Sequence, residues 1–211
     1  MERREARPIT IIVLAAGLST RFGRNKLLEP IGFGTMIERV VSETLRSRAD
    51  KTVVVLGHDA DKIREALKGL KCHFVVNEEF EKGQSFSVRK GLSAVEEAAQ
   101  ALMILPGDVA GVNHQMIDAV IAEYMETGAP IVTAGHHGIS GHPILFDRSL
   151  LGELKQIDEE SRGIKKVVAK HRSERRLVES SPLTLLDVDK QDDLERLAQV
   201  SPGLVPRPKG P

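Results

Sequence analysis

Short apolar runs alternate with stretches of helical period along most of the chain. The runs predict buried strands at residues 9–14, 52–56, 74–76, 102–105, 131–133, 144–146 and 185–188. Apolar positions at helical spacing predict helices over 36–45 (capped by Thr35), 63–70, 88–99 and 116–124, and around Leu194 and Leu197. Because the runs are apolar on both faces and helices separate them, we expect an α/β fold with a mostly parallel sheet between two helical layers.

Length and composition narrow the class of protein. The chain has 211 residues, so we expect one domain over residues 1–200, and the stretch 201–211, rich in Pro and Gly, is predicted to be a disordered tail. Thirty basic side chains balance thirty acidic ones, which argues against general binding to nucleic acid or membrane surfaces. An aromatic content of 3% without Trp argues against base-stacking platforms.

The N-terminal segment looks at first like an export signal, because arginines precede the apolar run 9–16. That run is shorter than the roughly 20 residues that span a bilayer. Glu2 and Glu5 also dilute the positive charge before it. The single Cys72 forms no internal disulfide, which is typical of a reducing compartment. We therefore expect a soluble, cytoplasmic protein.

The segment after the first predicted strand carries phosphate-binding chemistry. Small residues at 15–17 allow a ligand to approach the backbone closely, and Gly17 and Gly23 allow positive φ. Arg21 offers a planar fork for phosphate oxygens and Lys26 a mobile point charge. The stretch predicts a site for a polyphosphate, the alternative being an ordinary strand–helix connection with solvated cations.

Two common phosphate loops do not fit this segment. A P-loop requires Gly-x4-Gly-Lys followed by Ser or Thr, whereas Gly17 and Gly23 are spaced differently and Leu27 follows Lys26. A dinucleotide fingerprint requires Gly-x-Gly-x-x-Gly, but Ala15 and a threonine occupy the places that flank Gly17. The sequence therefore disfavours a dinucleotide-dependent oxidoreductase.

The pattern Leu-Ala-Ala-Gly-x-Ser-x-Arg-x-Gly-x-x-Lys-Leu resembles the signature of nucleotidyltransferases that attach a nucleotide to the molybdenum cofactor. Among them it is most similar to the molybdenum cofactor cytidylyltransferases, and the resemblance extends with weaker motifs over residues 9–194. It implies a Rossmann-like three-layer α/β/α nucleotidyltransferase fold, transfer of CMP from CTP to the terminal phosphate of molybdopterin, release of pyrophosphate and a requirement for Mg²⁺. A molybdoenzyme or chaperone that receives the product is a further implied partner.

The same resemblance assigns roles to the loop. Lys26 would contact the α-phosphate and Arg21 the leaving pyrophosphate. Ser85 and Ser87, in Gly-x-Ser-x-Ser, would touch the base, although serines at a helix start also act as caps. Ala16 takes the place of the Gly in guanylyl relatives, and its Cβ would narrow the pocket against a purine. The expected nucleotide-binding residues are Leu14, Ala15, Ala16, Gly17, Ser19, Arg21, Lys26, Ser85 and Ser87.

Acidic residues follow two of the predicted strands. Asp108 matches the segment where the family places a metal-binding Asp, although Ala110 stands where Pro is frequent. Alternation along the predicted strand 185–188 would point Asp187 and Asp189 to the same side. Asp189 matches the family's second metal ligand best, and the choice between the two stays open. A carboxylate at these places can also cap a helix or stabilise a turn.

Further motifs indicate an acceptor site. Gly141, His142 and Pro143 resemble the family's Gly-His-Pro, which lies toward the pterin. Arg162 lies in a segment, 158–163, that loosely resembles a family segment with a substrate-facing Arg. A solvated start of a helix is an equal alternative for that segment. His136, His137 and His142 suggest zinc, but we expect no zinc site, because no Cys or carboxylate is evident nearby.

Several alternative functions share parts of this pattern. Guanylyl transfer from GTP to the same cofactor would use the same loop. A cytidylyltransferase for a sugar or polyol phosphate usually carries Pro-Lys where this chain has Asn25 and Lys26. A non-enzymatic nucleotide- or pterin-binding module would not need both Asp108 and Asp189. We therefore favour an enzyme.

Overall fold

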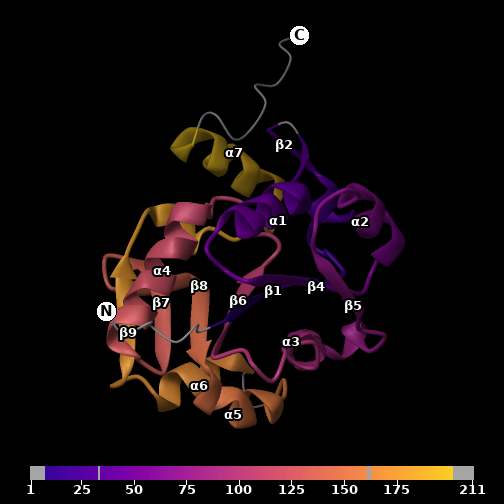
Figure 1. The fold of residues 1–211 in the computed structure, drawn as a ribbon. Coiled ribbons are helices and arrows are strands. Elements are labelled where there is room, and N and C mark those ends of the chain that lie inside the picture. Colours follow the sequence, from indigo (N-terminus) through magenta and orange to yellow (C-terminus); the bar gives the residue numbers. More distant parts are fainter. Residues whose placement is uncertain (1–7, 33, 161–162, 202–211) are drawn as a thin grey trace.

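A seven-stranded sheet forms the centre of the computed structural model, which describes residues 8–32, 34–160 and 163–201 (Figure 1). The strand order is β5-β4-β1-β6-β8-β7-β9. Both pairings of β8 are antiparallel and the other four are parallel. The strands are β1 (Ile9–Ala15), β4 (Lys51–Leu56), β5 (His73–Val76), β6 (Ala101–Pro106), β7 (Ile131–His136), β8 (Ile139–Asp147) and β9 (Arg175–Glu179), and β2 (Pro30–Ile31) pairs with β3 (Gly34–Thr35) in a separate ribbon.

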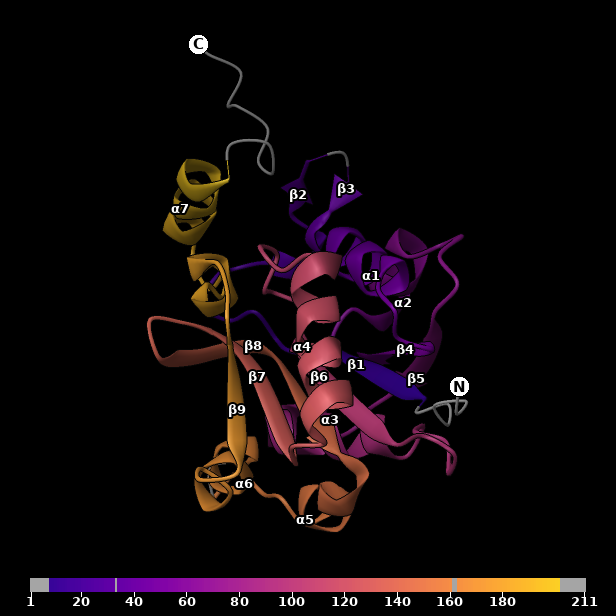
Figure 2. The ribbon, with the colours of Figure 1, turned by 60° about the vertical axis from the view of Figure 1, so that its left-hand side comes forward.

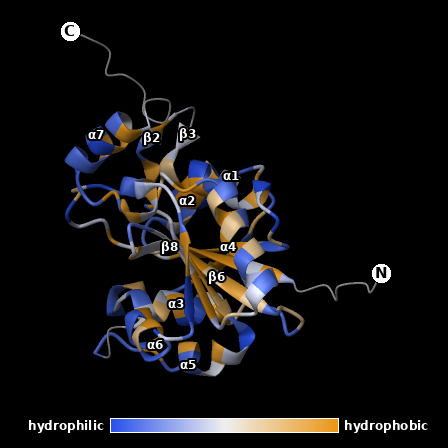
Figure 3. Cartoon of the chain, turned by 90° about the vertical axis from the view of Figure 1, so that its left-hand side faces the viewer, coloured by the Kyte–Doolittle hydropathy of each residue, from blue (hydrophilic) through white to orange (hydrophobic). Residues whose placement is uncertain are grey.

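Helices cover both faces of this sheet (Figures 1 and 3). On one face lie α1 (Met36–Arg46), α2 (Ala60–Ala66), α4 (His114–Thr127) and α7 (Gln191–Val200). On the other lie α3 (Gln84–Leu92), α5 (Leu151–Lys155) and α6 (Ile164–Lys170). The three-layer α/β/α architecture expected from the sequence is therefore confirmed. Within the described residues, every helix is too short or too polar to cross a membrane.

The central strand β1 joins the two halves of the core. Ile11 and Val13 pack into the cluster beneath α1 and α4, whereas Ile12 and Leu14 pack into the cluster beneath α3. All seven residues of β1 are buried, as expected for a central strand with both faces covered. The apolar run in the sequence thus corresponds to a strand that is inaccessible to solvent from either side.

The predicted start of α1 is confirmed in detail. The Thr35 hydroxyl accepts a hydrogen bond from the Glu38 backbone N–H at 3.3 Å, and the Glu38 carboxylate accepts one from the Thr35 backbone N–H at 2.6 Å. This reciprocal pair is a capping box. It fixes where the helix begins and therefore where the preceding loop must end.

Two expectations about secondary structure are wrong. Residues 185–188 form no strand, since a 3₁₀ turn (Pro182–Leu185) precedes an extended segment outside the sheet. The edge strand is instead β9, which the apolar pattern missed because its sequence, Arg-Arg-Leu-Val-Glu, has no apolar run.

The predicted helix 88–99 ends at Leu92, where the Ser93 hydroxyl donates to the Lys90 carbonyl. The predicted tail lies almost wholly outside the described residues.

The strand order creates a switch point beside β1. From β1 the chain continues outward through β4 and β5 on one side, and through β6 on the other (Figure 2). Ligands of open α/β sheets bind beyond the carboxyl ends of strands at such a point. The loops that follow β1 and β6 are therefore expected to form a ligand-binding site.

Gly91 provides a test of the packing between α3 and the sheet. A Cβ at this position would clash with the Ile12 side chain and lie 3.0 Å from Val55 Cγ2. We expect Gly91→Ala to lower the free energy of unfolding by about 1–3 kcal/mol through overpacking. Gly152→Ala, in α5, is the matched control, because a Cβ there meets nothing within 4 Å. Urea titrations of both variants measure the difference, and equal stability of Gly91→Ala and wild type would contradict this packing.

A cationic loop and two adjoining cavities

The loop after β1 folds back so that its end lies beside its beginning. The Ser19 hydroxyl accepts from the Lys26 backbone N–H at 3.3 Å, and the Ser19 carbonyl accepts from the Phe22 N–H at 2.9 Å. Positive φ occurs at Ser19 (52°) and Gly23 (78°), whereas Gly17, which would allow it, does not adopt it. The loop ends as Asn25 caps a 3₁₀ turn (Lys26–Leu28).

Lys26 lies between two carboxylates from distant parts of the chain. Its Nζ is 2.6 Å from Asp108 Oδ2 and 2.7 Å from Asp189 Oδ1. Burial lowers the pKa of Lys26, but the two carboxylates outweigh it and hold the pKa above its usual range. Arg21 Nη1 is 2.8 Å from Asp189 Oδ2, so that Arg21 and Lys26 are directed at the same acidic group.

The segment containing Asp189 reaches the site without belonging to the sheet. The Val188 backbone N–H donates to the Asp108 carbonyl at 3.1 Å, and the Val188 side chain is buried. The Asp193 carboxylate accepts from the backbone N–H groups of Asp189 and Lys190 at 2.9 and 2.8 Å. These contacts, rather than strand alternation, bring the acids together.

The acidic cluster fits a divalent cation. Asp108 Oδ1 is buried and has no hydrogen-bond partner among the described residues. Burial, then the charges of Asp108 and Asp189, raise the pKa of Asp187 to about 6. Three carboxyl groups thus crowd around the single ammonium group of Lys26. Hard cations such as Mg²⁺ prefer carboxylate oxygens, so the donor set is suitable.

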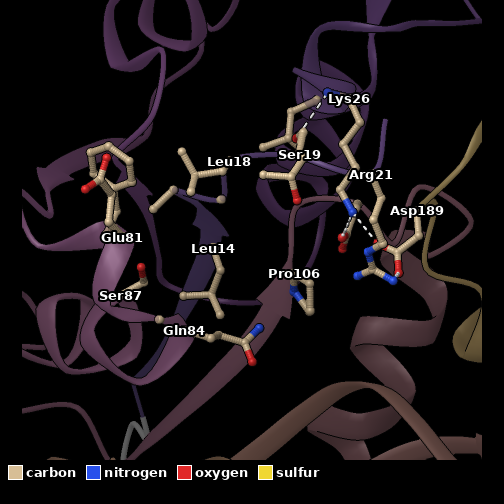
Figure 4. Close-up of a pocket in the computed structure, with 17 residues that line it drawn as sticks. Leu14, Leu18, Ser19, Arg21, Lys26, Glu81, Gln84, Ser87, Pro106 and Asp189 are labelled. Carbon is tan, nitrogen blue, oxygen red and sulfur yellow. Dashed lines mark hydrogen bonds and ion pairs between the residues drawn. The ribbon is translucent and has the colours of Figure 1, made fainter. Parts of the chain in front are cut away.

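A first cavity of about 380 Å³ opens over this cluster (Figure 4). Arg21, Lys26 and Asp189 lie at one end, and Ser87 and Gln84 at the other. The expected residues that line it are Leu14, Ala16, Gly17, Ser19, Arg21, Lys26, Ser87, Asp108 and Asp189. The cavity thus has a cationic end, which would suit a triphosphate, and a polar end without cations, which would suit a nucleoside.

Two expected nucleotide-binding residues lie elsewhere. Ala15 is fully buried in the core. Ser85 faces a separate pocket beside Gly163, and its backbone N–H donates to Glu159. Ser87, in contrast, is held at the first cavity by a 3.0 Å hydrogen bond from the Asn77 side chain.

Sequence reasoning did not single out several other residues of the first cavity. Most of them lie in or beside segments already marked as loop or helix start, whereas no sequence pattern marked Phe80 and Glu81, which lie in a 3₁₀ turn (Phe80–Lys82). The residues that were not singled out are Leu18, Thr20, Leu27, Phe80, Glu81, Gly83, Gln84 and Pro106.

A second cavity of about 860 Å³ adjoins the first. Arg21, Asp108 and Asp189 line both cavities. Gly141 and His142 line the second, as expected for an acceptor site, whereas Pro143 is buried and does not line it. Arg162 lies outside the described residues. The acids therefore stand at the boundary between two spaces, each large enough for a small molecule.

The histidines near the β7–β8 hairpin separate into two environments. Burial lowers the pKa of His142 to about 4, so its ring is neutral at pH 7. His136 and His137 lie instead with Glu179 of β9, and their possible metal-ligating atoms are all within 4.8 Å of one another. The expectation that no carboxylate lies near these histidines is therefore wrong, because β9 was missed.

Comparisons with known proteins agree with this geometry. The crystal structure of Rv0371c from Mycobacterium tuberculosis H37Rv is similar, with 29% identity and a TM-score of 0.82, over 92% of this chain and 98% of that chain. The manganese complex of Rv0371C from the same organism has 27% identity and a TM-score of 0.78, over 91% and 98%.

A curated relative matches a shorter part. The bifunctional protein GlmU of Desulfotalea psychrophila is 31% identical over 126 residues, 59% of this chain and 37% of that protein. This chain thus spans little more than a third of the length of that relative.

The family described as the MobA-like NTP transferase domain matches residues 11–176. These residues include the loop after β1, the Asp108 segment and both strands of the β7–β8 hairpin. With the seven-stranded sheet and the two adjoining cavities, this match shows that the chain belongs to the MobA-like NTP transferase domain family.

Proposed function

We propose that the protein transfers CMP from CTP to the terminal phosphate of molybdopterin and releases pyrophosphate. The observation that carries the proposal is the boundary between the cavities, where Lys26, Asp108 and Asp189 meet. A triphosphate in the first cavity and an acceptor phosphate in the second would approach each other there. The sequence motifs that resemble cytidylyltransferases supply the choice of base and acceptor.

The residues of the site act by alignment and by neutralising charge. An acceptor oxygen attacks the α-phosphorus in line, and the bond to the bridging oxygen breaks as pyrophosphate leaves with the electron pair. Lys26 holds the α-phosphate oxygens, while Arg21 and the amides of the loop hold the leaving pyrophosphate. Preorganised charges of this kind stabilise the transition state without covalent participation.

Asp108 and Asp189 would hold Mg²⁺ at the boundary. The bound ion supplies Lewis-acid neutralisation of phosphate oxygens. Lys26, which satisfies both carboxylates in this structure, would then be free to turn toward phosphate. Burial, and after it the charges of Asp108 and Asp189, raise the pKa of Asp187, which supports a need for positive charge here.

Removal of either key charge tests the catalytic assignment. We expect Lys26→Ala and Asp108→Ala each to lower the rate by at least 10²-fold, because Lys26 would neutralise the developing negative charge directly and Asp108 would do so through the metal ion that it holds. Pyrophosphate release with CTP, Mg²⁺ and purified molybdopterin measures the effect. Lys68→Ala and Asp118→Asn are matched controls, since their ion pairs with Glu65 and Arg48 lie outside both cavities. Near-normal turnover in Lys26→Ala or Asp108→Ala would refute the assignment.

Metal dependence gives an independent test. Chelation of divalent ions should abolish pyrophosphate release, and added Mg²⁺ should restore it. We expect Asp108→Asn to raise the Mg²⁺ concentration for half-maximal rate at least tenfold, because a carboxylate ligand is lost. Asp118→Asn should leave that concentration unchanged. Full activity in the presence of a chelator would exclude this role for Asp108.

The choice of base is tested at Ala16. This residue is 3% exposed, and its Cβ packs so closely against Gly57 that a Cβ at position 57 would lie 2.7 Å away. We expect wild type to prefer CTP, and Ala16→Gly to shift the ratio of kcat/KM toward GTP by about 10-fold, since one methyl group discriminates by about 1–3 kcal/mol. The ratio of kcat/KM for the two nucleotides does not depend on the fraction of the variant that is correctly folded. Better use of GTP than CTP by wild type would favour guanylyl transfer.

A further inference from the structure

The second cavity carries cations that the transfer step itself does not use. Lys165 of α6, Arg172 and Arg175 line this cavity and not the first, whereas Arg21 lines both; Lys165 also borders the small pocket beside Gly163. None of the three forms an ion pair with another described residue. The cations at the boundary would therefore serve the reacting phosphates, and a separate set of cations lies away from the first cavity.

Two of these cations come from α6 and from the turn after it. Lys165 and Ala169 lie four residues apart on one face of α6, Arg172 lies in the turn that follows the helix, and all three line the cavity. The neighbouring Lys166 and Lys170 do not line it, and Lys170 pairs with Glu153 at 2.9 Å. One face of this segment is thus cationic toward the cavity.

The rest of the wall is apolar, with two polar atoms that lack partners. Ile144, Ile164 and Val168 are half-buried and line the cavity. Ser140 Oγ and His142 Nδ1, from wall residues, are buried and have no hydrogen-bond partner among the described residues. Buried polar groups normally have hydrogen-bond partners. These two atoms therefore indicate a ligand that supplies the partners which the protein itself does not provide.

We propose that the acceptor is an organic phosphate with an apolar ring system and a second negative charge remote from the attacking phosphate, and that Lys165, Arg172 and Arg175 bind that second charge. This rests on the proposed function, which it deepens by defining the chemical class of the acceptor. A neutral sugar monophosphate would leave these cations and the apolar wall without counterparts.

Neighbouring cations provide matched controls for a kinetic test. Lys165→Ala and Arg175→Ala should each raise the KM for purified molybdopterin about tenfold or more, equivalent to about 1.4 kcal/mol of binding. Lys166→Ala and Arg176→Ala remove the same charges one residue away, outside the cavity, and should leave this KM unchanged. The shift in melting temperature produced by CTP should be the same in all four variants, because the first cavity is intact.

A dye assay separates this inference from the proposed reaction. The probe is 8-anilinonaphthalene-1-sulfonate, which combines an apolar ring system with one negative charge. We expect saturable binding to wild type, and a Kd at least threefold weaker in Lys165→Ala, Arg172→Ala and Arg175→Ala but not in the two controls. If wild type releases no pyrophosphate with molybdopterin, the proposed function fails and the dye decides alone. Cavity variants that bind the dye as the controls do would overturn the inference.

Discussion

One half-buried ammonium group shared by two carboxylates organises the site. Lys26 leaves the loop after β1, Asp108 follows β6, and Asp189 precedes α7, so that three segments far apart in sequence meet at one charge. Without Lys26 the acids would repel one another at close range. The pKa of Asp187 is already raised, first by burial and then by the charges of Asp108 and Asp189. Under the proposed function, a divalent cation would take over this neutralising role from the ammonium group when phosphates bind.

The position of this charge cluster follows from the topology of the sheet. β1 and β6 are adjacent and parallel, so their carboxyl ends open on the same edge. The close approach of Gly107 to the Leu14 carbonyl, with a 2.9 Å hydrogen bond, sets the two following loops side by side. The two cavities can therefore share one acidic wall. The proposed direct transfer between two bound substrates would need this geometry.

The antiparallel strand β8 gives the acceptor side its separate character. It enters the sheet between β6 and β7, and its Gly141–His142 segment forms part of the wall opposite α6. Gly141 is required there, because a Cβ would clash with the Thr184 carbonyl. The two cavities thus differ in chemistry: small residues and cations at the first, and an apolar wall with a cationic face at the second.

Local sequence determined the features that depend on neighbouring residues. The buried strand β1, the capping box at Thr35 and the cationic loop up to Lys26 could all be predicted, because apolar period, cap geometry and small residues act over a few positions. Only the tertiary structure decided that β9, with charged ends, becomes an edge strand, since its partner β7 lies some 40 residues earlier. The fold likewise decided that Asp189 reaches Lys26, as that contact depends on the Val188–Asp108 hydrogen bond across the chain.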